Sequence, residues 1–125
     1  MSPQNLVSLL LDDLHADLLP KIQKVLAGYG ELATEDTEFA SASPELVGAT
    51  ATVDGSSAIL WDLNHKELAR VTVTIRGDRV MLLSKVGTES HTGVFQAQDL
   101  TLPDSDLRQD EVLYEFLEDY VLDFL

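Results

Sequence analysis

The sequence contains no cysteine and few basic residues. It has 8 basic and 22 acidic residues, which gives a formal net charge of −14. The missing cysteines exclude disulfides and thiolate metal sites, and they fit a reducing compartment. The shortage of Lys and Arg makes contact with nucleic-acid phosphates or anionic membranes unfavourable over most of the surface. A basic protein partner would be attracted, although an acidic surface also serves solubility alone.

Long apolar runs are missing as well, since none approaches the ~18 residues that a membrane span needs. The N-terminal apolar stretch follows no positive charge and is interrupted by Asp12 and Asp13, so we expect no secretory signal. We therefore expect a cytoplasmic protein with no membrane partner. The length of 125 residues predicts a single domain, 1–125, whose core is large enough to be stable without disulfides.

Motifs for catalysis and for metal or phosphate binding are also missing. His15, His65 and His91 are scattered without the spacing of a zinc motif. Ser56-Ser57 does not stand in the G-x-S-x-G pattern of a nucleophile elbow, and no Gly-rich phosphate loop is present. We therefore expect no catalytic residue, no metal and no cofactor, and no enzymatic activity.

The clearest positive signal is the segment 70–76, in which apolar and polar residues alternate without a fault. Val71, Val73 and Ile75 fall on one face, while arginines and threonines occupy the other. A strand with one buried face produces this period of two, and its β-branched residues suit a pleated surface. The pattern predicts a central strand of an antiparallel sheet.

Weaker patterns around this segment predict a meander of four or five strands. The expected strands are 47–53, 57–63, 68–76, 80–86 and 94–102, the last with the weakest alternation. Asp54-Gly55 and Gly77-Asp78 are typical of tight hairpin turns, and 64–67 reads as a longer turn. We expect a loop at 87–93, so that the sheet occupies 47–102.

Helices are predicted at both ends of the chain, which gives an α+β fold. Ser2-Pro3 is a favourable helix start, and apolar residues then recur at spacings of three and four. Pro20 is expected to break or kink this helix, and Gly28 with Gly30 to end it, so that 1–30 is a kinked helical segment. The acidic segment 31–46 is expected to be a loop, either functional or loose surface.

The C-terminal segment 104–125 predicts a helix with a broad apolar face that packs on the sheet. From Asp110 onward its polar side carries acids and no basic residue, and the acids of the last turn oppose the helix dipole. Tertiary packing offsets this in one interpretation, and docking against a basic partner or a second copy does so in the other. The candidate partner-binding residues are Glu111, Glu115, Glu118, Asp119, Leu122 and Asp123.

The basic residues gather in one segment, because 66–85 contains five of the eight and only two acids. Arg70, Arg76 and Arg79 form a candidate anion-binding patch on the polar face of the sheet. The alternative is a solvated strand face whose arginines discourage edge pairing or pair with nearby carboxylates. Aromatic residues for stacking on bases are missing from that face, so we expect no nucleic-acid partner.

The order of helix, three antiparallel strands and final helix in a small acidic chain resembles type III secretion chaperones, over Val53 to Gly87 and Val112 to Leu125. That resemblance implies a homodimer that binds an unfolded segment of an effector protein. Those chaperones place a helix after the third strand, whereas 87–102 reads here as loop and strand. The resemblance is therefore one of architecture.

Taken together, these patterns favour a non-enzymatic, acidic protein-binding module, such as a chaperone, inhibitor or immunity-type protein. Its partner would be a basic or unfolded protein, and we expect a homodimer. The alternative is a small-ligand-binding or enzymatic domain with a pocket between sheet and helices.

Overall fold

The structure is a computed structural model that describes the backbone of residues 3–97 and 105–125 and the side chains of 18–97 and 110–125. Its elements confirm the expected α+β fold. In chain order they are α1 (Pro3–Glu35), α2 (Thr37–Ala42), η1 (Pro44–Leu46), β1 (Thr50–Asp54), β2 (Ser57–Trp61), β3 (Glu67–Arg76), β4 (Arg79–Val86), β5 (Glu89–Gln96), α3 (Ser105–Tyr120) and η3 (Leu122–Phe124).

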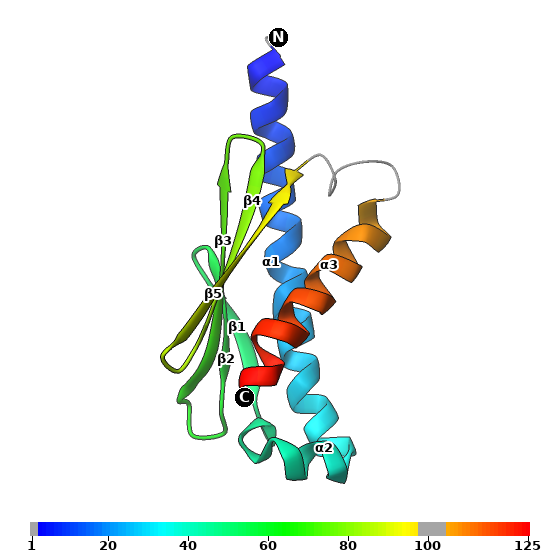
Figure 1. The fold of residues 1–125 in the computed structure, drawn as a ribbon, viewed down its shortest axis with the longest axis vertical. Coiled ribbons are helices and arrows are strands. Elements are labelled where there is room, and N and C mark those ends of the chain that lie inside the picture. The colour runs from blue at the N-terminus through cyan, green and yellow to red at the C-terminus, as the bar shows by residue number, and fades with distance from the viewer. Residues whose placement is uncertain (1–2, 98–104) are drawn as a thin grey trace.

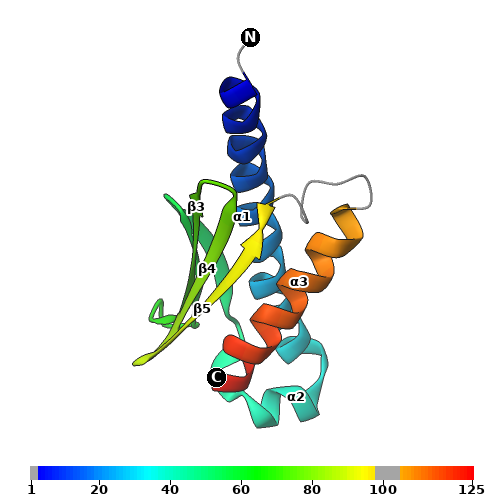
Figure 2. The same ribbon diagram turned by 45° about the horizontal axis from the view of Figure 1, so that its top comes forward.

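The molecule has two layers. The five strands form an antiparallel meander in the order β1-β2-β3-β4-β5. Both α1 and α3 lie against the same face of this sheet, and no described helix covers the other face (Figures 1 and 2). None of the described helices is long and apolar enough to cross a membrane.

Two-residue turns join three of the four strand pairs. Gly55-Ser56, Gly77-Asp78 and Gly87-Thr88 each place glycine first, and Gly77 and Gly87 have φ of +60° and +61°. This arrangement is typical of the type II′ hairpin turn, which needs positive φ only at its first residue. The expected loop at 87–93 is therefore wrong, because β5 begins directly after the third turn. Residues 98–102 of the expected last strand lie outside the described residues.

The core lies between the sheet and the two helices. In the register, Val71 faces Ser84 and Val73 faces Leu82, and all four side chains are buried. The helices contribute fully or almost fully buried residues to the same cluster, namely Leu18, Ile22, Leu26, Leu113, Phe116 and Leu117. From its place in the predicted strand 57–63 we expect Trp61 in the core, but its side chain projects onto the uncovered face, where its ring stacks on His65 with centroids 5.1 Å apart.

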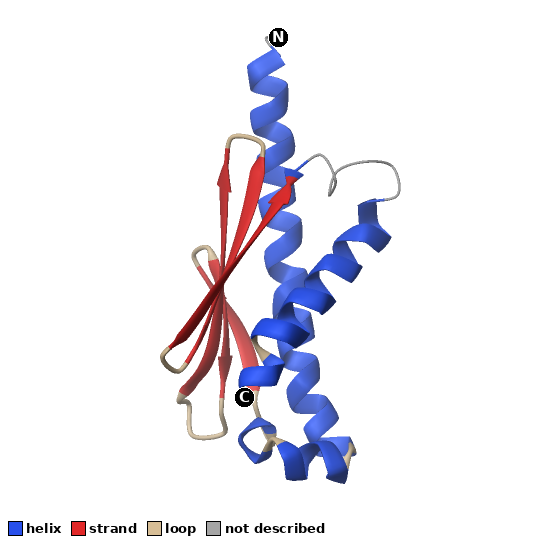
Figure 3. Cartoon of the chain, in the orientation of Figure 1, coloured by secondary structure: helices blue, strands red, loops and turns tan. Residues whose placement is uncertain are grey.

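Helix α1 continues past every expected breaking point. Pro20 lies inside it, and it runs 33 residues to Glu35 as one uninterrupted ribbon (Figure 3). A proline removes one backbone donor, but the buried residues on both sides of Pro20 pack on the same sheet and hold the two halves together. Gly30 does not end the helix; it lies where α1 passes closest to the backbone of Ala49.

The acidic segment 31–46 is helical and is not a loop. It contains the end of α1, then α2 and η1. Asp36 caps α2, because its Oδ1 accepts hydrogen bonds from the amides of Glu38 and Phe39 at 3.0 and 3.2 Å. Leu46 is fully buried, so the segment is anchored to the core despite its acidic composition.

Ser84 provides a test of the core. Its hydroxyl is fully buried and has no hydrogen-bond partner among the described residues, whereas the buried Ser57 Oγ lies 2.8 Å from Thr72 Oγ1. An unpaired buried hydroxyl costs ~1–3 kcal/mol, so Ser84→Ala is expected to raise the free energy of unfolding by about 1 kcal/mol. The matched Ser57→Ala should lower it by about 1 kcal/mol, because it deletes a made bond. Urea unfolding of both variants measures this, and a loss in Ser84→Ala would mean that this hydroxyl has a partner.

Candidate functional site

The two edge strands of the sheet, β1 and β5, differ in how they are protected against pairing with a further strand. At the β1 edge, α1 lies alongside and Gln23 Nε2 donates a hydrogen bond of 3.0 Å to the carbonyl of Ala51. At the other edge, the eight residues of β5 contain neither Lys nor Pro, Glu89 at the start of the strand is their one acidic residue, and their register with β4 has no bulge. Charged residues, prolines and bulges are the usual means by which proteins prevent pairing at an edge strand. Beyond Glu89, β5 carries none of these features, so within the residues that the structure describes its edge remains suited to strand pairing.

The backbone groups at this edge can be assigned from the hydrogen-bond pattern. The Ala97 amide donates to the Asp78 carbonyl at 2.8 Å, so the facing residues Arg79 and Gln96 form a wide pair without a mutual bond. Because bonded and wide pairs alternate along an antiparallel ladder, every second residue of β5 turns its N–H and C=O away from β4. The four residues are Ser90, Thr92, Val94 and Gln96.

A groove of about 300 Å³ runs between β5 and α3. Its walls combine aromatic and acidic side chains: Phe95 from the strand, and Phe116, Tyr120, Glu115 and Asp119 from the helix. The groove adjoins the β5 edge, which no described element covers, since Thr92, Gly93 and Val94 also line it.

Gly93 allows the helix to approach the strand. A Cβ at this position would lie 3.0 Å from ring carbons of both Phe116 and Phe95. The Phe116 ring therefore packs directly against the strand backbone, which no larger residue would permit without displacement. This contact fixes the width of the groove.

His91 packs against the C-terminal end of α3. Its ring stacks on Tyr120 with centroids 4.9 Å apart and lies 4.7 Å from the ring of Phe124. Tyr120 in turn contacts Phe116 at 5.1 Å. His91 therefore packs in an aromatic cluster, so the C-terminal end of the chain is tied to the start of β5.

The structure divides the candidate partner-binding residues of α3 and η3 into separate groups. Glu115 and Asp119, one turn apart, line the groove. Glu118 and Asp123 lie toward α1: burial chiefly, and then these two carboxylates, raise the pKa of the Tyr29 phenol, which therefore stays neutral. Leu122 is half-buried and packs against the core, which makes it unsuitable as a test of an interface.

The remaining candidate, Glu111, is exposed on α3. Tyr114 of the same helix is 58% exposed beside a smaller hollow of about 170 Å³ between α1 and α3. Across that hollow, Lys21 Nζ lies 3.6 Å from Asp110 Oδ1, a bridge that joins the two helices.

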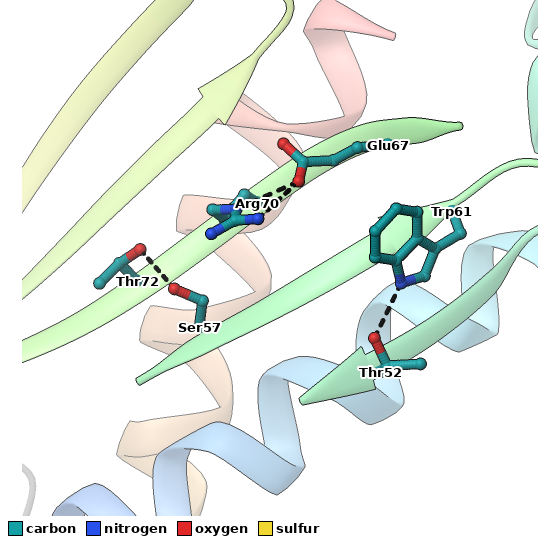
Figure 4. Close-up of polar contacts among 6 residues, drawn as sticks. All are labelled: Thr52, Ser57, Trp61, Glu67, Arg70 and Thr72. Atoms are coloured by element: carbon teal, nitrogen blue, oxygen red, sulfur yellow. Dashed lines mark hydrogen bonds and ion pairs between the residues drawn. The ribbon is translucent and has the colours of Figure 1, made fainter. Parts of the chain in front are cut away.

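The candidate anion-binding arginines all project from the uncovered face of the sheet. Arg70 is held by Glu67, whose Oε1 accepts bonds from Nε at 3.2 Å and Nη2 at 2.8 Å (Figure 4). Arg76 and Arg79 face each other across the β3–β4 hairpin, and neither has an ion pair within the described chain. Like charges directly opposite each other destabilise a strand pair, so these two arginines do not stabilise the hairpin.

Other polar groups on this face have structural partners. Trp61 Nε1 donates to Thr52 Oγ1 at 2.8 Å, and the Ser57 and Thr72 hydroxyls are bonded to each other (Figure 4). Asp62 Oδ1 accepts from the amides of Asn64 and Lys66, both at 2.8 Å, and so closes the turn before β3. Within the residues described, no group of three or more His, Asp or Glu is arranged to hold a metal ion.

The sequence predicts the last strand at 94–102, after a loop at 87–93, so it misses the first five residues of β5. Two signals were available: Gly87-Thr88 has the form of a two-residue turn, and polar residues alternate with His91, Gly93 and Phe95 after it. Comparison with protein-family models, curated proteins and solved structures finds no match to this chain. The absence of a helix between β4 and β5 in the described chain agrees with the noted departure from type III secretion chaperones.

Proposed function

We propose that this chain is a non-enzymatic protein-binding module whose partner presents basic residues. The observation that carries the proposal is the groove between β5 and α3, in which exposed carboxylates stand beside aromatic rings. A lysine or arginine side chain matches both, because its aliphatic stem covers apolar surface while its charged head meets a carboxylate or a ring face.

The charge of the whole molecule supports the same partner class. A net charge of −14 produces a negative potential that attracts a basic surface and speeds its association more than it adds affinity. The groove is also where the alternative function, binding of a small ligand between sheet and helix, would have its pocket. We favour a protein because the groove is continuous with an open strand edge, which offers backbone groups to a polypeptide.

A cytoplasmic location and a homodimer belong to the same proposal and have their own measurements. Fractionation of native cells tests the location. Sedimentation velocity over a range of concentrations tests the dimer, and a single monomer boundary at every concentration would remove it.

Selection from a displayed library of random twelve-residue peptides tests the partner class. The wild type is expected to enrich peptides rich in Lys and Arg, whose affinity falls as salt rises. Combining Glu115→Gln with Asp119→Asn should abolish this enrichment. The matched control, Glu31→Gln with Glu35→Gln, removes the same charge from exposed residues outside the groove and should select the same peptides as the wild type. Enrichment without basic residues, or equal loss in both double variants, would contradict the proposal.

A further inference from the structure

We infer that β5 binds an extended segment of its partner by strand addition, with alternate Lys or Arg side chains of that segment entering the groove between β5 and α3. This inference rests on the proposed function, since it states how the basic partner is held. Strand addition supplies affinity through main-chain hydrogen bonds and specificity through sites for alternate side chains.

The backbone of β5 provides the first part of the site. Ser90, Thr92, Val94 and Gln96 turn their N–H and C=O groups to the open edge, and no hydrogen bond connects these groups to another element within residues 3–97 and 105–125. Every second residue of an extended segment beside β5 would form backbone hydrogen bonds with these four residues. The opposite edge is not equivalent, because Gln23 occupies the Ala51 carbonyl there.

The position of α3 provides the second part. A strand added beside β5 continues the alternation of the sheet, so every second side chain points to the helix side. There it meets the rings of Phe116 and Tyr120 and the carboxylates of Glu115 and Asp119. The other side chains lie on the uncovered face next to Val94, which is 52% exposed, and suit apolar β-branched residues.

A second copy of this chain fits the site poorly. If two β5 strands paired, each would bring Glu89, His91, Gly93 and Phe95 to the helix side of the other. That set contains no Lys or Arg, so the carboxylates of Glu115 and Asp119 would gain no cation from it. The occupant is therefore a foreign basic segment.

The probe is a capped, fluorescent eight-residue peptide in which lysine alternates with valine, titrated by anisotropy at low salt. A peptide with glutamate in place of lysine should bind at least roughly tenfold more weakly, given the charge of the groove. A peptide of the same composition with lysines and valines in separate blocks should also bind more weakly, because strand addition needs the alternation.

Proline at the edge tests the backbone contribution. Thr92→Pro removes an amide that points to the open edge and none that bonds β4, so the sheet is kept and affinity should fall at least roughly tenfold. The matched control is Val53→Pro, since Val53 alternates with Ala51 and its amide points to the opposite edge. That variant should bind the lysine–valine peptide as the wild type does, and circular dichroism verifies both folds.

Methylation of the peptide gives an answer that needs no variant. One peptide carries N-methyl groups on every valine and the other on every lysine. Strand addition uses only one of these two sets of amides, so one peptide should lose binding and the other keep it. Equal effects of the two methylations would overturn the inference, even if Thr92→Pro failed to fold.

The outcomes separate this inference from the proposed function. If the lysine peptide outbinds the glutamate peptide but the two methylated forms bind alike, strand addition is wrong and the basic partner stands. If the lysine and glutamate peptides bind equally, or neither binds, both proposals fail. A wild type that sediments as a dimer and becomes a monomer on Thr92→Pro would assign the edge to a second copy and overturn the inference.

Discussion

Val73→Asp is expected to abolish cooperative folding. Val73 lies in the middle of β3, is almost fully buried and faces Leu82 of β4 beneath the helices. The substitution loses about 1.5–3 kcal/mol of apolar burial and leaves an unpaired charge in the core. Together these terms approach the whole stability of a typical domain, ~5–15 kcal/mol, so thermal melting by circular dichroism should lose its transition.

Thr74→Asp is the matched control for this prediction. Thr74 is the next residue of β3, but its side chain is exposed on the uncovered face. The same new charge stays in water there, and the free energy of unfolding should fall by less than about 1 kcal/mol. Equal damage from the two substitutions would show that β3 is shifted by one residue, because a slip of one exchanges the faces of a strand.

Gly30→Ala is expected to destabilise the protein by about 2–3 kcal/mol, although alanine is the better helix former. A Cβ at Gly30 would overlap the carbonyl oxygen of Ala49, and it would lie 3.1 Å from the carbonyl carbon. A backbone carbonyl cannot swing aside as a flexible side chain can, so α1 would have to move away from the segment that leads into β1. Urea unfolding measures the loss.

Gly28→Ala, two residues earlier in the same helix, should have the opposite sign. A Cβ at Gly28 has no atom within 4 Å, so the substitution only removes the entropic cost of glycine in a helix. A gain of about 0.5–1 kcal/mol is expected. If Gly30→Ala gave the same gain, α1 would not approach Ala49 as closely as the structure places it.

These contacts connect the stability of the fold to the proposed binding site. The groove exists because Phe116 packs on the backbone of Gly93 and because His91 holds the end of α3 through Tyr120 and Phe124. The carboxylates that would contact a basic segment are thereby carried on a helix fixed against the strand that would pair with it. A rigid support of this kind reduces the ordering cost of binding.

The central part of the fold follows from the sequence alone. The alternation in 70–76 decides which side chains of β3 are buried, because a strand has a side-chain period of two and one face of this sheet is covered. Gly77-Asp78 likewise specifies a tight turn by local conformational preference. Both features depend on neighbours in sequence, which is why local reasoning predicts them.

The long helix and the acidic segment required the tertiary structure. Local rules predict a break or a kink at Pro20 and the end of the helix at Gly28 with Gly30. The helix nevertheless continues to Glu35, because burial of its face against the sheet outweighs the loss of one hydrogen bond and the cost of glycine. The segment 31–46 looked like a loop by composition, and only the burial of Leu46 shows that it is anchored. Propensity is a weak prior wherever packing opposes it.

The candidate site divides in the same way. The sequence determined that the C-terminal helix carries carboxylates and no basic residue after Arg108, and that β3 and β4 carry three of the four arginines. Only the tertiary structure decided that Glu115 and Asp119 stand beside a strand edge that no described element covers and that Leu122 packs inward. The physical reason is that an edge, a groove and a burial pattern arise from contacts between segments far apart in the chain, and a pattern within one segment does not encode them.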